Sequence, residues 1–187
     1  MHEKLDVCLA AAVILAASRS GLADTSSPRE FRDPPSIFLI AKSHNKNQVH
    51  YSVRTDEGCN VVGPEPLYGY WRMLEKRGEI EAMLPSEVPA YGVASAQRIE
   101  KAPQETTIRT RLNAVPDRPL VIKVTGAGGR CEASATTSIA GVDAHLRWIY
   151  VRLSWPFGVD YVLLRGFRLS DGRPVEEKLQ PGRDDAP

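Results

Sequence analysis

The sequence has few cysteines, few aromatic residues and almost no excess of charge. Aromatic residues make up 7% of the chain, and 24 Lys and Arg residues stand against 23 Asp and Glu residues. A net charge of +1 gives no field that would hold a phosphate backbone, so we expect no nucleic acid among the partners. None of the three cysteines forms a C-x-x-C pair, which argues against a redox enzyme or a zinc knuckle. The 187 residues leave room for one domain with one core.

Long hydrophobic runs are also absent. The uncharged run Val7–Ala17 falls far short of the roughly 20 residues that span a bilayer, so we expect no transmembrane anchor. A short apolar run followed by small residues at Gly21 and Ala23 is typical of a secretory signal peptide. The sequence therefore predicts a signal peptide over 1–23 and a periplasmic or secreted protein. A buried N-terminal helix is the alternative.

Cleavage after Ala23 would remove one cysteine and leave Cys59 and Cys131. An even pair in an exported protein predicts a disulfide, and two free thiols are the alternative. Closing a loop of that length would stabilise the fold by about 4 kcal/mol in the chain-entropy treatment.

Short apolar or alternating runs, separated by Pro, Gly, Asp and Asn, predict an all-β fold. We expect an antiparallel up-and-down barrel or a sandwich of about nine strands, and the short separators slightly favour the barrel. One short helical turn is expected within 80–90, where Pro85 and Pro89 limit its length. The predicted strands are Ile37–Ala41, Val49–Val53, Leu67–Leu74, Tyr91–Ile99, Thr106–Leu112, Leu120–Thr125, Glu132–Ile139, Leu146–Trp155 and Tyr161–Leu169.

The ends of the mature chain lack any hydrophobic period. We expect a flexible leader over 24–36 and a disordered tail over 180–187, both rich in Pro and charge. The strands between them predict a single all-β domain over 37–179.

Patterns for metal binding and catalysis are weak. His44, His50 and His145, with Asp143, have no metal-ligand spacing, so exposed histidines at strand ends are favoured over a metal site. No nucleophile motif is present, and the glycines at 126–129 suit a hairpin turn better than a phosphate loop. We expect no cofactor and no metal.

Two arginines share a strand face with apolar residues. Arg147 is in phase with Ile149 and Val151, and Arg165 is in phase with Leu163. Inside a barrel the two guanidinium groups would need acidic partners or an anionic ligand. The alternatives are that the opposite face is the core, or that Asp and Glu residues pair with both arginines.

Four segments carry a resemblance to a known family: Phe38–Tyr51, Pro66–Leu74, 90–92 and Asp160–Gly166. Together they resemble a family of exported bacterial proteins known only as a domain of unknown function. The resemblance implies a small exported all-β domain and supplies no catalytic residues. The positions that match best are Lys42, Ser43, Asn45, Asn47, Tyr70, Trp71, Tyr91 and Gly92.

These observations predict a non-catalytic exported domain that binds a small ligand or another cell-envelope component. An exported hydrolase or other enzyme is the alternative, followed by a purely structural module. Polar side chains after an apolar strand could bind a polar or anionic ligand, although Asn residues also suit hairpin turns. The candidate contacts are Lys42, Ser43, Asn45, Asn47, Tyr70 and Trp71.

Overall fold

A computed structural model describes residues 34–94, 97–103, 105–127, 130–156 and 158–180. The predicted signal peptide, most of the leader and nearly all of the predicted tail lie outside these residues. Within them, no helix is long and apolar enough to cross a membrane.

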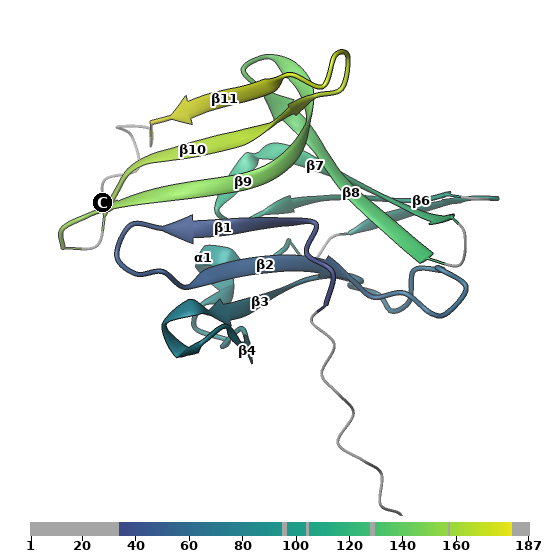
Figure 1. Ribbon diagram of the computed structural model, residues 1–187, viewed down its shortest axis with the longest axis horizontal. Helices are drawn as coiled ribbons and strands as arrows, with labels where there is room; N and C mark the ends of the chain where they lie inside the picture. Colours follow the sequence, from purple (N-terminus) through teal and green to yellow (C-terminus); the bar gives the residue numbers. More distant parts are fainter. Residues whose placement is uncertain (1–33, 95–96, 104, 128–129, 157, 181–187) are drawn as a thin grey trace, which may run out of the picture. The chain divides into compact units, whose positions relative to one another are not determined.

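The described chain forms one sheet of 11 strands, which confirms the all-β prediction (Figure 1). The first four strands are β1 (Phe38–Lys42), β2 (Gln48–Val53), β3 (Leu67–Met73) and β4 (Glu79–Ala82). The next four are β5 (Arg98–Ala102), β6 (Glu105–Leu112), β7 (Val115–Ala127) and β8 (Arg130–Ile139). The last three are β9 (Val142–Ser154), β10 (Gly158–Arg168) and β11 (Pro174–Leu179). We call β1–β4 the N-terminal arm and β5–β8 the middle arm.

Strand β9 joins the two arms, because it pairs with β8 through its first half and with β1 through its second. Its other edge pairs with β10, which continues to β11. The path through the sheet runs β4-β3-β2-β1-β9-β8-β7-β6-β5 and does not close, so the closed barrel is excluded. The β1–β9 pair is parallel, whereas the other strand pairs are antiparallel as predicted.

One core forms between the arms, because apolar residues alternate with polar ones along most strands and both arms contribute to the same buried cluster. From the N-terminal arm this cluster takes Phe38, Ile40, Val49, Tyr51, Leu67 and Trp71. From the middle arm it takes Ile108, Leu112, Val115, Leu120, Ile122, Val124, Ala135 and Ile139. We call the face of the N-terminal arm that carries Phe38 and Trp71 its inner face, and the opposite face its outer face.

The structure differs from the prediction at three strands. The strand predicted over Tyr91–Ile99 is wrong for most of its length, because β5 begins only at Arg98. Strands β4 and β11 were not predicted: both are short, carry several charged residues and lie at sheet edges, where such residues deter pairing with other chains. The predicted helical turn is α1 (Val88–Tyr91), and a 3-10 turn, η1 (Leu74–Lys76), follows β3.

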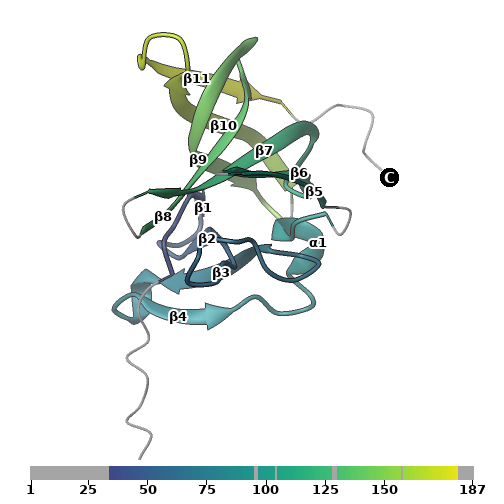
Figure 2. The same cartoon turned by 90° about the vertical axis from the view of Figure 1, so that its right-hand side faces the viewer.

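Two connections tie the arms together besides β9. A disulfide joins Cys59, in the loop after β2, to Cys131 in β8, with 5.2 Å between the Cα atoms, which confirms the predicted pair. The turn α1 lies between the N-terminal arm and the middle arm (Figure 2). The Tyr51 hydroxyl donates to the Tyr91 carbonyl, and the Asn113 side chain donates to the Val88 carbonyl.

Candidate functional site

The predicted cation Lys42 lies at the end of β1, on the inner face of the N-terminal arm. Alternation places it in phase with Phe38 and Ile40, which are buried, and the Lys42 side chain is itself half-buried. Its ammonium nitrogen lies 4.7 Å from the ring centroid of Trp71 and 5.8 Å from that of Tyr91. Both distances are within the range of cation–π attraction.

The Trp71 ring is fixed by two neighbours from the segment after β4. Its indole Nε1 donates to Oε2 of Glu87 at 2.7 Å, and the backbone N–H of Leu84 donates to the same oxygen at 2.8 Å. The Tyr91 ring meets Trp71 edge-on, with centroids 5.5 Å apart. Residues 84–91 therefore hold the two rings on which the Lys42 ammonium rests.

Burial governs the titration of the two tyrosines here. It raises the pKa of the Tyr91 phenol, and the neighbouring Glu87 carboxylate raises that pKa further. Burial also raises the pKa of Tyr51 well above its usual range, and Tyr91 adds to this effect. Both phenols are therefore neutral at physiological pH, and Tyr51 keeps the proton that it donates to the Tyr91 carbonyl at 2.6 Å.

The Lys42 ammonium has no carboxylate partner among the residues that the structure describes. Its interactions there are the two ring contacts. Glu87, the acid beside Trp71, is occupied by the indole and by the Leu84 amide. A half-buried cation stabilised by ring faces alone retains its capacity to bind an anion.

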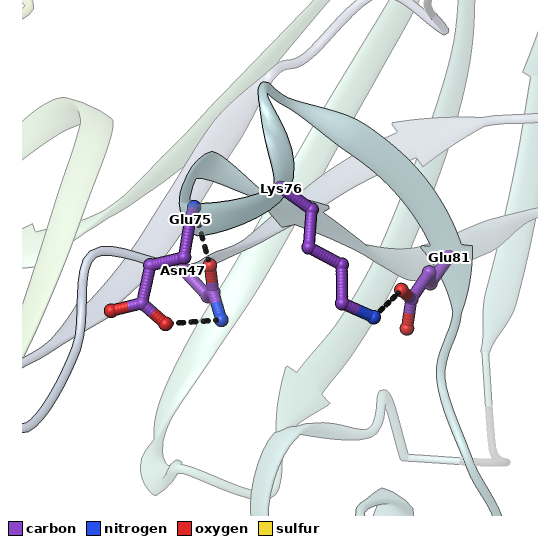
Figure 3. A network of polar contacts seen from close by, with 4 residues as sticks. All are labelled: Asn47, Glu75, Lys76 and Glu81. Atoms are coloured by element: carbon purple, nitrogen blue, oxygen red, sulfur yellow. Dashed lines mark hydrogen bonds and ion pairs between the residues drawn. The ribbon is translucent and has the colours of Figure 1, made fainter.

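The asparagines and serine of the predicted contact set have structural partners. Asn47 is 7% exposed and exchanges two hydrogen bonds with Glu75 of η1: its amide donates to the carboxylate at 3.3 Å, and its oxygen accepts the backbone N–H at 3.2 Å (Figure 3). The Asn45 side-chain oxygen accepts the Asn47 backbone N–H at 3.1 Å, as in an Asx turn. The Ser43 hydroxyl accepts the backbone N–H of Leu153 in β9 at 3.0 Å.

The structure separates Tyr70 from Trp71, because adjacent strand residues point to opposite faces. Tyr70 lies on the outer face, where its ring stacks with His50 and its hydroxyl donates to the Pro34 carbonyl at 2.9 Å. The predicted leader is thus held against the sheet at its last residues. Of the six predicted contacts, Lys42 and Trp71 lie together, and Tyr91 and Glu87 complete their surroundings. Glu87 gave no signal in the sequence, although the resemblance included Tyr91.

The histidines are dispersed. His50 is buried on the outer face between the Ser36 hydroxyl, 2.8 Å from Nδ1, and the Gln48 side-chain oxygen, 3.0 Å from Nε2. His44 is exposed in the β1–β2 loop, and His145 is exposed on β9. Within the described part of the chain, no three His, Cys, Asp or Glu residues gather as they would around a metal ion.

The two arginines lie outside the core. Arg147 is exposed although Ile149 is buried, because an irregularity in the β9–β10 pairing at Arg147 itself, between Leu146 and Trp148, changes the phase of the strand. Arg165 is on the outward face of β10 and forms an ion pair with Glu176. Placement inside a barrel, the first of the alternatives above, is therefore wrong. The two arginines nevertheless border one pocket of about 300 Å³.

Comparison with known protein families assigns the chain to one of them. Residues 38–178 match the family described as a domain of unknown function, DUF4833, and the chain belongs to that family. No curated protein and no solved structure matches it. Family membership confirms the resemblance to a domain of unknown function and brings neither an activity nor a compartment with it.

Proposed function

We propose that the protein is exported and acts without catalysis, by binding the anionic group of a small ligand or of another cell-envelope component at Lys42. The observation that carries this proposal is the Lys42 ammonium, half-buried over Trp71 and Tyr91. An anion reaching it would form a charge-assisted contact in a partly dry setting, where such contacts are strongest.

Two further features support this function. The Cys59–Cys131 disulfide suits export, because disulfides persist in oxidising compartments. Around Lys42, the polar side chains are engaged with one another: Asn47 with Glu75, and Glu87 with Trp71. A rigid surrounding of this kind lowers the ordering cost of binding.

The test compares three forms of the protein purified from the cell envelope under native conditions: wild type, Lys42→Met and Lys46→Met. Lys46 is the matched control, because it is an exposed lysine in the loop that directly follows Lys42. Mass spectrometry of the extracted small molecules and of co-purified envelope components should find an anionic species with wild type and Lys46→Met, and lose it with Lys42→Met. The same species at the same yield from all three forms would contradict the proposal.

A serine hydrolase is a second candidate, favoured by the contact between Ser36 and His50. The Ser36 hydroxyl lies 2.8 Å from Nδ1 of His50, and the Gln48 oxygen lies 3.0 Å from Nε2. In the tautomer with the proton on Nε2, that N–H donates a hydrogen bond to the Gln48 oxygen, and the unprotonated Nδ1 faces the Ser36 hydroxyl as its base. A fluorophosphonate probe should then label Ser36 in wild type and nothing in Ser36→Ala; an unlabelled wild type removes this candidate.

A further inference from the structure

The pocket between β9, β10 and β11 is a second place where cations and an apolar surface meet. It has a volume of about 300 Å³, at the lower end of the range for ligand pockets. Its lining comprises Arg147, Arg165, Gly166, Phe167, Pro174, Val175 and Glu176. It lies on strands that do not carry Lys42.

A β-bulge places Arg147 at this pocket. In the β9–β10 ladder Arg165 pairs with Trp148 and Gly166 pairs with Leu146, so Arg147 is the extra residue with no partner opposite. The chains are in close contact here: a Cβ on Gly166 would overlap the His145 carbonyl oxygen. Only glycine therefore fits at position 166, opposite this bulge.

The charges around the pocket are unequal. Arg165 pairs with Glu176, and its guanidinium carbon lies 4.8 Å from the ring centroid of Trp148. Arg147 has neither an ion pair nor a hydrogen bond to its side chain among the described residues. Two guanidinium groups thus face one carboxylate, which leaves a positive charge uncompensated. The Arg165–Glu176 pair is half-exposed, so it constrains Arg165 only weakly.

The remaining lining is apolar. Phe167, which is 44% exposed, stands beside Pro174 and Val175, and the arginine stems add aliphatic carbon. Phe167 and Pro174 are directly opposite each other in the β10–β11 ladder. A ligand that filled this pocket would bury its apolar part there and present its charge to the arginines.

We propose that this pocket binds a small carboxylate or phosphate monoester that also carries an apolar or aromatic body. Planar guanidinium groups match the oxygens of a carboxylate or phosphate and can contact them in pairs. Arg147 supplies the cation without a protein partner, and Arg165 supplies a second one held against Trp148. Phe167 and Pro174 receive the apolar body. This site is independent of the one at Lys42.

Phenyl phosphate is the probe for the experiment, with inorganic phosphate and phenol as its separate halves. Each is titrated into the full-length ¹⁵N-labelled chain, and backbone amide shifts are followed at Gly166 and Val175. Phenyl phosphate should produce saturable shifts at these amides and bind roughly tenfold more tightly than either half. Equal affinity for phenyl phosphate and inorganic phosphate would overturn the apolar part of the proposal, and no saturation would overturn all of it.

Substitutions test whether Arg147 contacts the ligand directly or acts only through its charge at long range. Arg147→Ala should weaken phenyl phosphate binding by roughly tenfold, a loss of about 1.4 kcal/mol. Arg152→Ala is the matched control, since it removes the same charge from the same strand at a residue that does not line the pocket. An equal loss in both variants would indicate a long-range charge effect and overturn the site. Lys42→Ala should leave the phenyl phosphate shifts at Gly166 and Val175 unchanged. Failure of this proposal is therefore distinguishable from failure of the proposed function at Lys42.

Discussion

The two arms of the sheet fill the same core with different side chains. The N-terminal arm contributes the aromatic residues Phe38, Tyr51 and Trp71. The Tyr51 hydroxyl and the Trp71 indole N–H donate hydrogen bonds to the segment around α1. The core residues of the middle arm are all aliphatic, including Ile108, Ile122 and Ile139 among the described ones. Aliphatic packing needs only matched volume, whereas a buried hydroxyl or indole also needs a partner in a fixed place.

This difference explains why the candidate site lies on the N-terminal arm. A buried polar atom constrains the loop that supplies its partner, so Tyr51 and Trp71 fix the segment that carries Glu87 and Tyr91. The middle arm joins its strands through short hairpins and has no comparable network around its core residues within the described chain. The predictions that follow test this contrast, from the largest expected effect to the smallest.

Removing the disulfide should have the largest effect, because it is a covalent link between the arms. Replacing Cys59→Ser and Cys131→Ser together should lower the free energy of unfolding by about 4 kcal/mol, mainly through the greater entropy of the unfolded chain. Urea denaturation measures this loss. Reduced wild type is the control and should match the double variant; an unchanged midpoint in both would contradict the prediction.

In the middle arm, loss of volume alone should be costly. Ile122 is 0% exposed, so Ile122→Ala should lower the free energy of unfolding by about 3 kcal/mol through lost burial and the cavity that remains. Val121→Ala, at a half-buried position on the other face of β7, should cost less than about 1 kcal/mol. Similar losses in the two variants, measured by chemical denaturation, would show that this arm does not depend on close packing.

In the N-terminal arm, loss of a single polar atom should be measurable. Tyr51→Phe keeps the ring but leaves the Tyr91 carbonyl without its donor, which should lower the free energy of unfolding by about 1.5 kcal/mol near neutral pH. A loss near zero would remove the contrast between the arms.

The same variant should change how stability depends on alkaline pH. The raised pKa of Tyr51 means that the folded protein keeps a proton that the unfolded chain releases above about pH 10. Stability from this group is therefore complete below pH 10 and falls as pH rises above it. Tyr51→Phe should show a shallower decline in denaturation experiments between about pH 9 and pH 11. An identical slope in the two proteins would contradict this.

The smallest effect is expected in the loop. Asn47→Ala removes two hydrogen bonds to Glu75 and should lower the free energy of unfolding by about 1 kcal/mol. Glu75→Gln keeps an acceptor and the backbone N–H, so it should leave stability within about 0.5 kcal/mol of wild type. Thermal and urea denaturation of both variants provide the comparison, and equal losses would show that the carboxylate charge is what matters.

Most strands could be predicted from the sequence, because β-branched and aromatic residues alternate along them. The exceptions have physical reasons. The residues of β11, PVEEKL, resemble a polar loop, since this edge strand carries three consecutive charged residues, of which Glu176 and Lys178 are exposed. The parallel β1–β9 pair joins residues far apart in the chain, and periodicity within each strand carries no information on such partners.

The candidate site was predicted in part. The cluster of a cation and polar side chains after an apolar strand indicated Lys42 and Asn47 as candidates. In the structure Lys42 contacts the Trp71 ring, whereas Asn47 is hydrogen-bonded to Glu75. Glu87 could not be found, because its role depends on the Trp71 indole from another element. The orientation of Arg147 could not be predicted either. Strict alternation along β9 places Arg147 in phase with Ile149, but a β-bulge in the β9–β10 pairing breaks that alternation, and a single strand's sequence does not reveal a bulge.

The parallel pair β1–β9 has a consequence for the order in which the protein can fold. Strand β1 is synthesised early, yet the neighbour on one of its edges is β9, near the other end of the described chain. Until β9 is available, a nascent N-terminal arm would expose that edge as an unpaired strand, which is prone to pair with other chains. Such long-range pairing gives a high contact order, and we expect the native sheet to form late and slowly, once β9 has emerged.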